Sequence, residues 1–166
     1  MNLARMLKAR ADEGRPVRVG VIGAGKFGSM FLSQVRTTPG MHLYGIADLS
    51  IPRARAALTA TGWDVETQVA SSFDEALRTG RTVLTEDAGA LIAADGLDVV
   101  VEVTGNPAAG AAHALKAIEH GRHIVMVTVE ADVLVGPLLA ERARQAGVVY
   151  SMAYGDQPAL VCEMVD

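Results

Sequence analysis

The 166-residue sequence is poor in several features that would point to other classes of protein. Its one cysteine, Cys162, excludes an internal disulfide and a cysteine-rich metal site. The net charge of −4 gives no reason to expect nucleic acid or an anionic membrane surface as a partner. No apolar run approaches the length of a membrane span, and the N-terminus lacks the apolar core of a signal peptide. We therefore expect a soluble, cytoplasmic protein.

Aromatic residues are also scarce, at 4% of the sequence, although 50% of the residues are apolar. The apolar content is largely alanine, valine and leucine, which suits alanine-rich helices covering a valine-rich parallel sheet. The length fits one domain with a sizeable core. The histidines have no companions at metal-ligand spacing, and we expect them to be structural or solvated: His42, His113, His120 and His123.

A glycine-rich turn follows the first apolar segment of the chain. The β-branched run 17–22 leads into Gly23-x-Gly25-x-x-Gly28, and a helical pattern follows. Gly23 allows the tight turn, Gly25 lets the backbone approach a pyrophosphate, and Gly28 lets the helix pack closely on the strand. This arrangement predicts a dinucleotide site. A turn that binds nothing is the main alternative, and a methyltransferase fits the glycine spacing less well.

Residues on either side of this turn would complete the cofactor site. The unpaired N–H groups at the start of the helix, including those of Lys26 and Phe27, are expected to face the phosphates. Asp48 ends the second apolar run and can accept hydrogen bonds from an adenosine ribose, which favours NAD. Arg53 and Arg55 follow closely and could instead hold the 2′-phosphate of NADP. The choice between NAD and NADP therefore stays open.

A second group of polar residues follows the later apolar runs. Thr104, Gly105 and Asn106 form a turn that can contact ribose or phosphate, and Asn106 is also a good helix N-cap. Glu130 lies just past the next run and could orient a nicotinamide amide or a substrate hydroxyl, or be a solvated loop carboxylate. Glu102 lies inside an apolar strand, where it needs a partner, and we expect it to have a structural role.

Alternating strands and helices with short connections predict an α/β fold, a doubly wound parallel sheet of the Rossmann type with six main strands. A short amphipathic helix over 2–12 precedes it. The segment 81–84 is either a small extra strand or a loop, and Gly136-Pro137 opens a helix. In the helix over 26–36, the predicted buried stripe is Phe27, Met30, Phe31 and Val35. The predicted strands are 17–22, 41–47, 67–70, 97–103, 123–129 and 148–152.

The chain divides into three parts on this interpretation. Residues 1–16 are an N-terminal helical appendage, 17–154 are the dinucleotide-binding domain, and 155–166 read as the start of a missing catalytic domain. The last segment has the apolar pattern of a helix without a stop signal. The prediction is that this sequence is truncated before a second domain.

Several segments together resemble one family of enzymes. The segments 19–25, 101–107 and 127–132 are similar to the N-terminal domain of homoserine dehydrogenase-like oxidoreductases. The nearest branch carries a SAF domain and includes 1-deoxy-D-xylulose 5-phosphate reductoisomerase-like enzymes. Homoserine dehydrogenases usually have Ala-Asn-Lys where this chain has Thr128-Val129-Glu130. The resemblance implies NADPH, a homo-oligomer, and catalytic residues in the absent domain, so no catalytic residue is assigned here.

These observations favour the cofactor domain of an oxidoreductase. It would transfer hydride between NAD(P)H and a small carbonyl or polyol-phosphate substrate, and residues 1–166 alone are expected to be inactive. An NAD(H)-binding regulatory domain and a dimerisation module remain the alternatives. The acidic charge balance and the lack of a basic helix count against a DNA-binding regulator.

Overall fold

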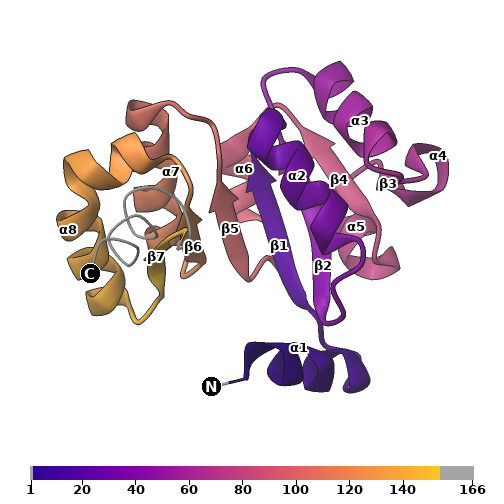
Figure 1. The fold of residues 1–166 in the computed structure, drawn as a ribbon, viewed down its shortest axis with the longest axis horizontal. Coiled ribbons are helices and arrows are strands. Elements are labelled where there is room, and N and C mark those ends of the chain that lie inside the picture. The colour runs from indigo at the N-terminus through magenta and orange to yellow at the C-terminus, as the bar shows by residue number, and fades with distance from the viewer. Residues whose placement is uncertain (1, 154–166) are drawn as a thin grey trace, which may run out of the picture.

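The valine-rich runs of the sequence form one parallel sheet (Figure 1). The protein is described here by a computed structural model that covers residues 2–153. All strand pairs are parallel, and their order in the sheet is β3-β4-β2-β1-β5-β6-β7. The strands are β1 (Val17–Ile22), β2 (Met41–Ala47), β3 (Val69–Ala70), β4 (Thr82–Thr85), β5 (Val99–Glu102), β6 (His123–Met126) and β7 (Tyr150–Met152).

Most of the helices lie between strands, and most begin at a residue whose side chain caps the first turn. Four of these caps, Ser50, Ser72, Asp87 and Asn106, accept the N–H of the residue three positions later, which satisfies an otherwise unpaired donor. The helices are α1 (Leu3–Asp12), α2 (Lys26–Val35), α3 (Ile51–Ala60), α4 (Val65–Gln68), α5 (Phe73–Thr79), α6 (Ala88–Ala93), α7 (Pro107–Glu119) and α8 (Val129–Ala146).

Helices cover the two faces of the sheet unequally. On one face, α2 and α3 pack against β1 and β2, around Leu32, Leu43 and Ile46. On the other face, α5, α6, α7 and α8 bury a larger cluster that includes Val100 and Ile124. Figure 1 shows α2 and α3 over the half of the sheet that holds β1 and β2, while α7 and α8 lie at the opposite end.

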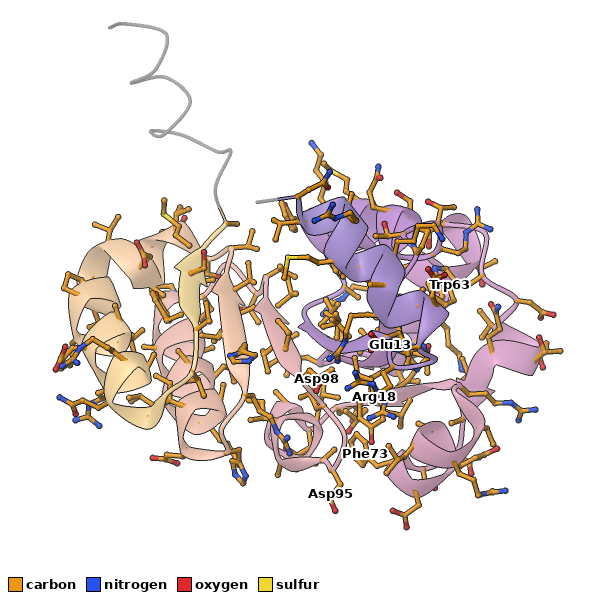
Figure 2. The ribbon with its side chains drawn as sticks, turned by 90° about the horizontal axis from the view of Figure 1, so that it is seen from below. Glu13, Arg18, Trp63, Phe73, Asp95 and Asp98 are labelled. Carbon is orange, nitrogen blue, oxygen red and sulfur yellow. The ribbon has the colours of Figure 1, made fainter. Side chains whose placement is uncertain are left out.

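The order of the strands reverses on either side of β1, which pairs with β2 and with β5. In open α/β sheets a ligand crevice lies at this reversal, beyond the carboxyl ends of the strands. Figure 2 looks at the opposite edge, where the amino ends of β1 and β5 meet. There the Asp98 carboxylate accepts the Arg18 N–H at 2.8 Å, so a direct hydrogen bond joins these two strands away from the crevice.

The predicted doubly wound parallel sheet is confirmed, with one more strand than expected. Residues 82–85 form β4, which pairs with both β2 and β3. The predicted strand over 67–70 is mostly wrong, because Asp64 caps the short helix α4 and only Val69 and Ala70 pair in the sheet. The next residues, 73–79, form the helix α5.

The prediction that a helix opens at Gly136-Pro137 is wrong. Helix α8 begins at Val129, directly after β6, and runs through Pro137 to Ala146. Glu130 and Asp132 in its first turn favour an early start, because negative charges stabilise a helix N-terminus. Pro137 removes only one backbone donor from a long helix whose outer face is exposed at Val133, Leu134 and Leu138.

The predicted buried stripe of α2 is confirmed for Val35 and for the partly buried Phe31, and it is wrong for Phe27 and Met30. The side chains of Phe27 and Met30 are 41% and 58% exposed, whereas Gly28, Leu32 and Val35 are buried. The close approach of Gly28 to the backbone of the glycine turn fixes the rotation of the helix. Residues four and seven positions further on then share its buried face.

Some predictions fall outside the described residues. The segment 155–166, which was predicted to start a further domain, lies outside them, as does Cys162. Within residues 2–153, no helix has the length and apolar character needed to cross a membrane.

Candidate functional site

A cavity of about 510 Å³ lies at the carboxyl ends of the central strands. It collects the glycine turn after β1, the end of β2, the loop after β4, and the turn from β5 into α7. It is lined by Ile22, Gly23, Gly25, Ala47, Asp48, Leu49, Arg53, Glu86, Ala88, Val103, Thr104, Asn106, Ala109 and His113. This is the position that the strand order predicts for a ligand.

Two glycines of the turn are required by the fold itself. Gly23 has φ +111°, and a Cβ there would lie 2.9 Å from the carbonyl oxygen of Val103. A Cβ on Gly28 would collide with the carbonyl oxygen of Gly23. Any side chain at either position would therefore push α2 or the turn away from the sheet.

The third glycine is different, because nothing in the protein requires it. Gly25 has φ −76°, a conformation that any residue adopts, and a Cβ there would meet no atom within 4 Å. It opens α2, whose first turn has N–H groups without partners among residues 2–153, at Lys26, Phe27 and Gly28. The open space and these donors together fit the close approach of a phosphate group.

Asp48 connects the glycine turn to the end of β2. Its Oδ2 accepts the Ala24 N–H at 2.7 Å, and its Oδ1 accepts the Ser50 N–H at 2.8 Å. The Arg53 guanidinium donates to the same Oδ1, from Nε at 2.9 Å and from a terminal nitrogen at 2.6 Å. The Asp48 side chain is only 3% exposed, so its carboxylate serves first to hold the turn in place.

The surroundings of Asp48 keep it ionised. Burial alone would raise the pKa of this carboxyl, but the hydrogen bonds from Arg53, Ala24 and Ser50 hold its pKa below the ordinary value. Arg53 is half exposed and bound to Asp48, so the two side chains neutralise each other at this end of the cavity. A ligand here would meet the pair, not a lone carboxylate or a lone guanidinium.

A second buried carboxylate, Glu102, lies at the carboxyl end of β5. It is fully buried, and its Oε1 accepts the Thr104 hydroxyl at 2.6 Å. Its Oε2 accepts the Thr128 hydroxyl, and Nδ1 of His113 lies 3.2 Å from its Oε1. The expected structural role of Glu102 thus has specific partners in the turn after β5, on α7 and in the segment after β6.

These partners also control the ionisation of Glu102. Burial alone would raise the pKa of its carboxyl, whereas the hydrogen bonds from His113, Thr104 and Thr128 lower that pKa below its usual value. No arginine or lysine is paired with Glu102 among the described residues. The carboxylate therefore depends on two neutral hydroxyls and on one histidine ring.

The turn after β5 contains three residues that the sequence analysis singled out. Thr104 and Asn106 line the cavity, whereas Gly105 adopts φ +69° between them. The Asn106 side-chain oxygen accepts the Ala109 N–H at 3.0 Å, which is its expected capping role. The side-chain amide nitrogen of Asn106 forms no hydrogen bond with residues 2–153 and stays available to a ligand.

Other residues expected at the site lie outside the lining of this cavity. Glu130 is exposed in the first turn of α8, because that helix begins earlier than predicted. Lys26 and Phe27 are exposed at the start of α2, and their backbone N–H groups have no partner among residues 2–153. The structure thus brings Gly23, Gly25, Asp48, Arg53, Thr104 and Asn106 together.

His113 is the residue that the sequence analysis missed. It was expected to be structural or solvated, yet its ring lines the cavity and contacts Glu102. The spacing of Asn106, Ala109 and His113 places all three on one face of α7, and this signal could have been used. Among residues 2–153, no group of three or more potential ligands is arranged to hold a metal ion.

Comparison with known proteins agrees with this geometry. Residues 17–154 match the family described as an oxidoreductase family with an NAD-binding Rossmann fold. The chain belongs to this family. The match covers most of the sequence, and all the residues that line the cavity lie within it. A comparison with curated proteins finds no match.

Solved structures share the fold at low sequence identity. A biliverdin reductase from Synechocystis sp. PCC 6803, in complex with biliverdin and NADP+, has a TM-score of 0.64 at 22% identity. A scyllo-inositol dehydrogenase from Lactobacillus casei, with bound NAD(H) and scyllo-inositol, has a TM-score of 0.65 at 13% identity. The matches cover 82% and 91% of this chain but only 37% and 41% of those chains. The chain thus spans less than half the length of these oxidoreductases.

Proposed function

We propose that these residues hold the nicotinamide cofactor of an oxidoreductase that transfers hydride to or from a small carbonyl or hydroxyl compound. The family supplies the class of protein, and the cavity supplies the site. Relatives of known structure bind an inositol or biliverdin beside the cofactor, which supports a small organic substrate. When bound, the nicotinamide would provide the hydride, and the residues described here would position it.

The observation that carries this proposal is the space beside Gly25. The fold does not require a glycine there, because the backbone is ordinary and a Cβ would contact nothing. A pyrophosphate lying against the unpaired N–H groups at the start of α2 would explain the glycine, because a side chain there would occupy the space of the phosphate. Gly23 and Gly28 would then build the turn, and the N–H groups of Lys26 and Phe27 would bind phosphate.

The remaining residues have separate roles in the proposed site. Asp48 and Arg53 would lie at the adenosine ribose, where their pairing leaves the preference between NAD and NADP open. Thr104, Gly105 and Asn106 would lie along the other half of the cofactor. Glu130, exposed on α8, would reach the substrate side only if a ligand extends beyond the cavity.

The finer assignment rests on the sequence resemblance. We keep the homoserine dehydrogenase-like group, with its SAF-domain and reductoisomerase-like branch, as the proposed subgroup. A polyol-phosphate substrate, a homo-oligomeric state and a cytoplasmic location belong to the same proposal. So does the division into an appendage over 1–16, a cofactor domain over 17–154 and the start of a catalytic domain at 155–166.

The proposal is tested by calorimetric titration of residues 1–166 with NADH and NADPH. The unaltered chain should bind at least one of them, and Gly25→Val should abolish measurable binding, because its side chain fills the phosphate position. The melting temperature should stay unchanged, since the added atoms meet no protein atom. Ala56→Val, which adds bulk on an exposed position of α3, is the matched control and should bind normally.

One result would contradict the proposal, and a second would contradict only the expectation that residues 1–166 are inactive on their own. Equal affinity in a folded Gly25→Val chain would show that no phosphate lies at the turn. Oxidation of NADH by residues 1–166 with an aldehyde or sugar phosphate, followed by its absorbance, would contradict the expectation that catalysis needs further domains.

A further inference from the structure

The Glu102 carboxylate fixes the direction of the hydrogen bonds around it. A carboxylate accepts and cannot donate, so the hydroxyls of Thr104 and Thr128 both donate to it. Each hydroxyl oxygen then accepts a backbone N–H, Thr104 from Asn106 at 3.2 Å and Thr128 from Gly105 at 3.0 Å. These hydrogens are therefore used inside the protein, and none of them is left for a ligand.

The same argument fixes the proton on the His113 ring. Its Nδ1 lies 3.2 Å from the Glu102 carboxylate, so Nδ1 must carry the hydrogen that joins them. In the neutral ring, Nε2 then has a lone pair and no hydrogen. Nε2 forms no hydrogen bond with any residue from 2 to 153, and the side chain is 20% exposed on the wall of the cavity.

The charge at this end of the cavity restricts what can bind beside His113. Glu102 is buried without a paired arginine or lysine, and the three successive unpaired N–H groups of α2 are at the other turn, after β1. A phosphate would be repelled by the buried carboxylate and would find few donors. A neutral group that donates a hydrogen bond would instead pair with the bare Nε2.

We infer that His113 binds the cofactor through Nε2 as a hydrogen-bond acceptor, and that Glu102 is the positioning residue that holds its ring. The ligand group is a hydroxyl or an amide NH2, and it is not a phosphate. This inference rests on the proposed function, because an NAD(P) molecule carries both ribose hydroxyls and a carboxamide. Asn106, whose amide nitrogen is open to the cavity, would pair with an acceptor on the same ligand.

The protonation of the His113 ring in the unaltered protein provides the first test. Nitrogen-15 NMR of the histidine side chains at neutral pH should show His113 with a protonated Nδ1 and a bare Nε2. Adding NADH should move the Nε2 resonance in the direction of hydrogen-bond acceptance. A purely structural histidine would show no such movement, and a ring with its hydrogen on Nε2 would overturn the inference.

Variants provide the second test, by titration with NADH, ADP-ribose and ADP. His113→Phe keeps a ring but removes the acceptor, and its affinity for NADH should fall about tenfold, as for one lost hydrogen bond. His120→Phe, on an exposed position at the end of the same helix, should bind as the unaltered chain does. Glu102→Gln should weaken binding too, with more of the His113 hydrogen on Nε2.

The ligand series identifies the donor. A loss with NADH alone points to the carboxamide, a loss shared with ADP-ribose points to the terminal ribose, and a loss in all three points to the adenosine ribose. Unchanged affinities in His113→Phe, together with an unmoved Nε2 resonance, would overturn the inference while the proposed function stands. If the unaltered chain binds none of the three ligands, the proposed function itself fails.

Discussion

The two ends of the cavity each hold a buried carboxylate, but they stabilise it differently. At the end of β2, Asp48 accepts two backbone N–H groups and is paired with the cation of Arg53. At the end of β5, Glu102 has no such cation and accepts two hydroxyls and a histidine ring. The first carboxylate is neutralised by Arg53, whereas the second is not paired with an arginine or lysine among the described residues.

This difference has a consequence for binding. The Asp48 carboxylate and the Arg53 guanidinium largely neutralise each other, and the Glu86 carboxylate also lines the cavity. The lone charge of Glu102 orders its neighbours and makes the β5 end a site for hydrogen-bond donors. Similar carboxylates at similar strand ends thus favour different chemical groups, because their partners differ.

The largest expected effect is on Glu102. Replacing it with alanine leaves the buried Thr128 hydroxyl, the Thr104 hydroxyl and the His113 ring without their acceptor. The free energy of unfolding should therefore fall by about 3–5 kcal/mol. Urea denaturation followed by circular dichroism measures this loss. Glu119→Ala, an exposed position on α7, should change the stability little. A loss below about 1 kcal/mol for Glu102→Ala would contradict the difference between the two ends.

The corresponding change at the β2 end should be smaller. Asp48→Ala removes the acceptor of the Ala24 and Ser50 N–H groups, and should cost about 1–2 kcal/mol of stability. It also frees Arg53 for a 2′-phosphate. Binding of NADH should weaken by about 1–3 kcal/mol, and binding of NADPH should weaken less or improve. Equal losses for the two cofactors would show that this pair does not contact the ribose.

Lowering the pH should reduce the stability that the Asp48 and Glu102 carboxylates give to the folded chain. The pKa values of Asp48 and Glu102 are lower in the folded chain than the ordinary values of these groups. Their stabilisation is therefore complete above the ordinary carboxyl pKa, and it is lost as the pH falls through the lowered values. Urea denaturation at a series of pH values should show this loss, and Glu102→Gln should reduce its slope. An unchanged slope in this variant would exclude Glu102 as a contributor.

The smallest effect on stability is expected for the replacement of Arg53, the cation paired with Asp48. Arg53 is half exposed, so Arg53→Gln should cost less than about 1 kcal/mol, as is usual for an ion pair at the surface. A double-mutant cycle with Asp48→Asn measures the pair directly. A coupling well above about 1 kcal/mol would mean that the cation, and not the backbone N–H groups, holds Asp48 in place.

Much of the fold was predictable because local patterns decide it. The β-branched runs predicted the strands, and the glycine spacing predicted the turn between β1 and α2. The prediction failed where two signals competed. Pro137 suggested a helix start, but the first turn after β6 already favoured a helix. In α2, apolar side chains suggested the buried face, whereas the contact at Gly28 turned Phe27 and Met30 outward.

The site was predictable in part for the same reason. The sequence pointed to Gly25, Asp48, Thr104 and Asn106, each next to a recognisable turn or strand end. It could not show that Arg53 is bound to Asp48 or that His113 reaches Glu102. Such contacts depend on how α3 and α7 are rotated against the sheet.

The sequence by itself determined the class of fold, the glycine turn and the class of cofactor, because these follow from short-range periodicity and spacing. Only the tertiary structure decided which polar groups are hydrogen-bonded within the protein and which are left free. It joined Glu102 to His113 across 11 positions in the sequence, and to Thr128 across 26. Hydrogen bonding is a matter of distance and direction in space, so the free acceptor on His113 and the open space at Gly25 appear only once the chain is folded.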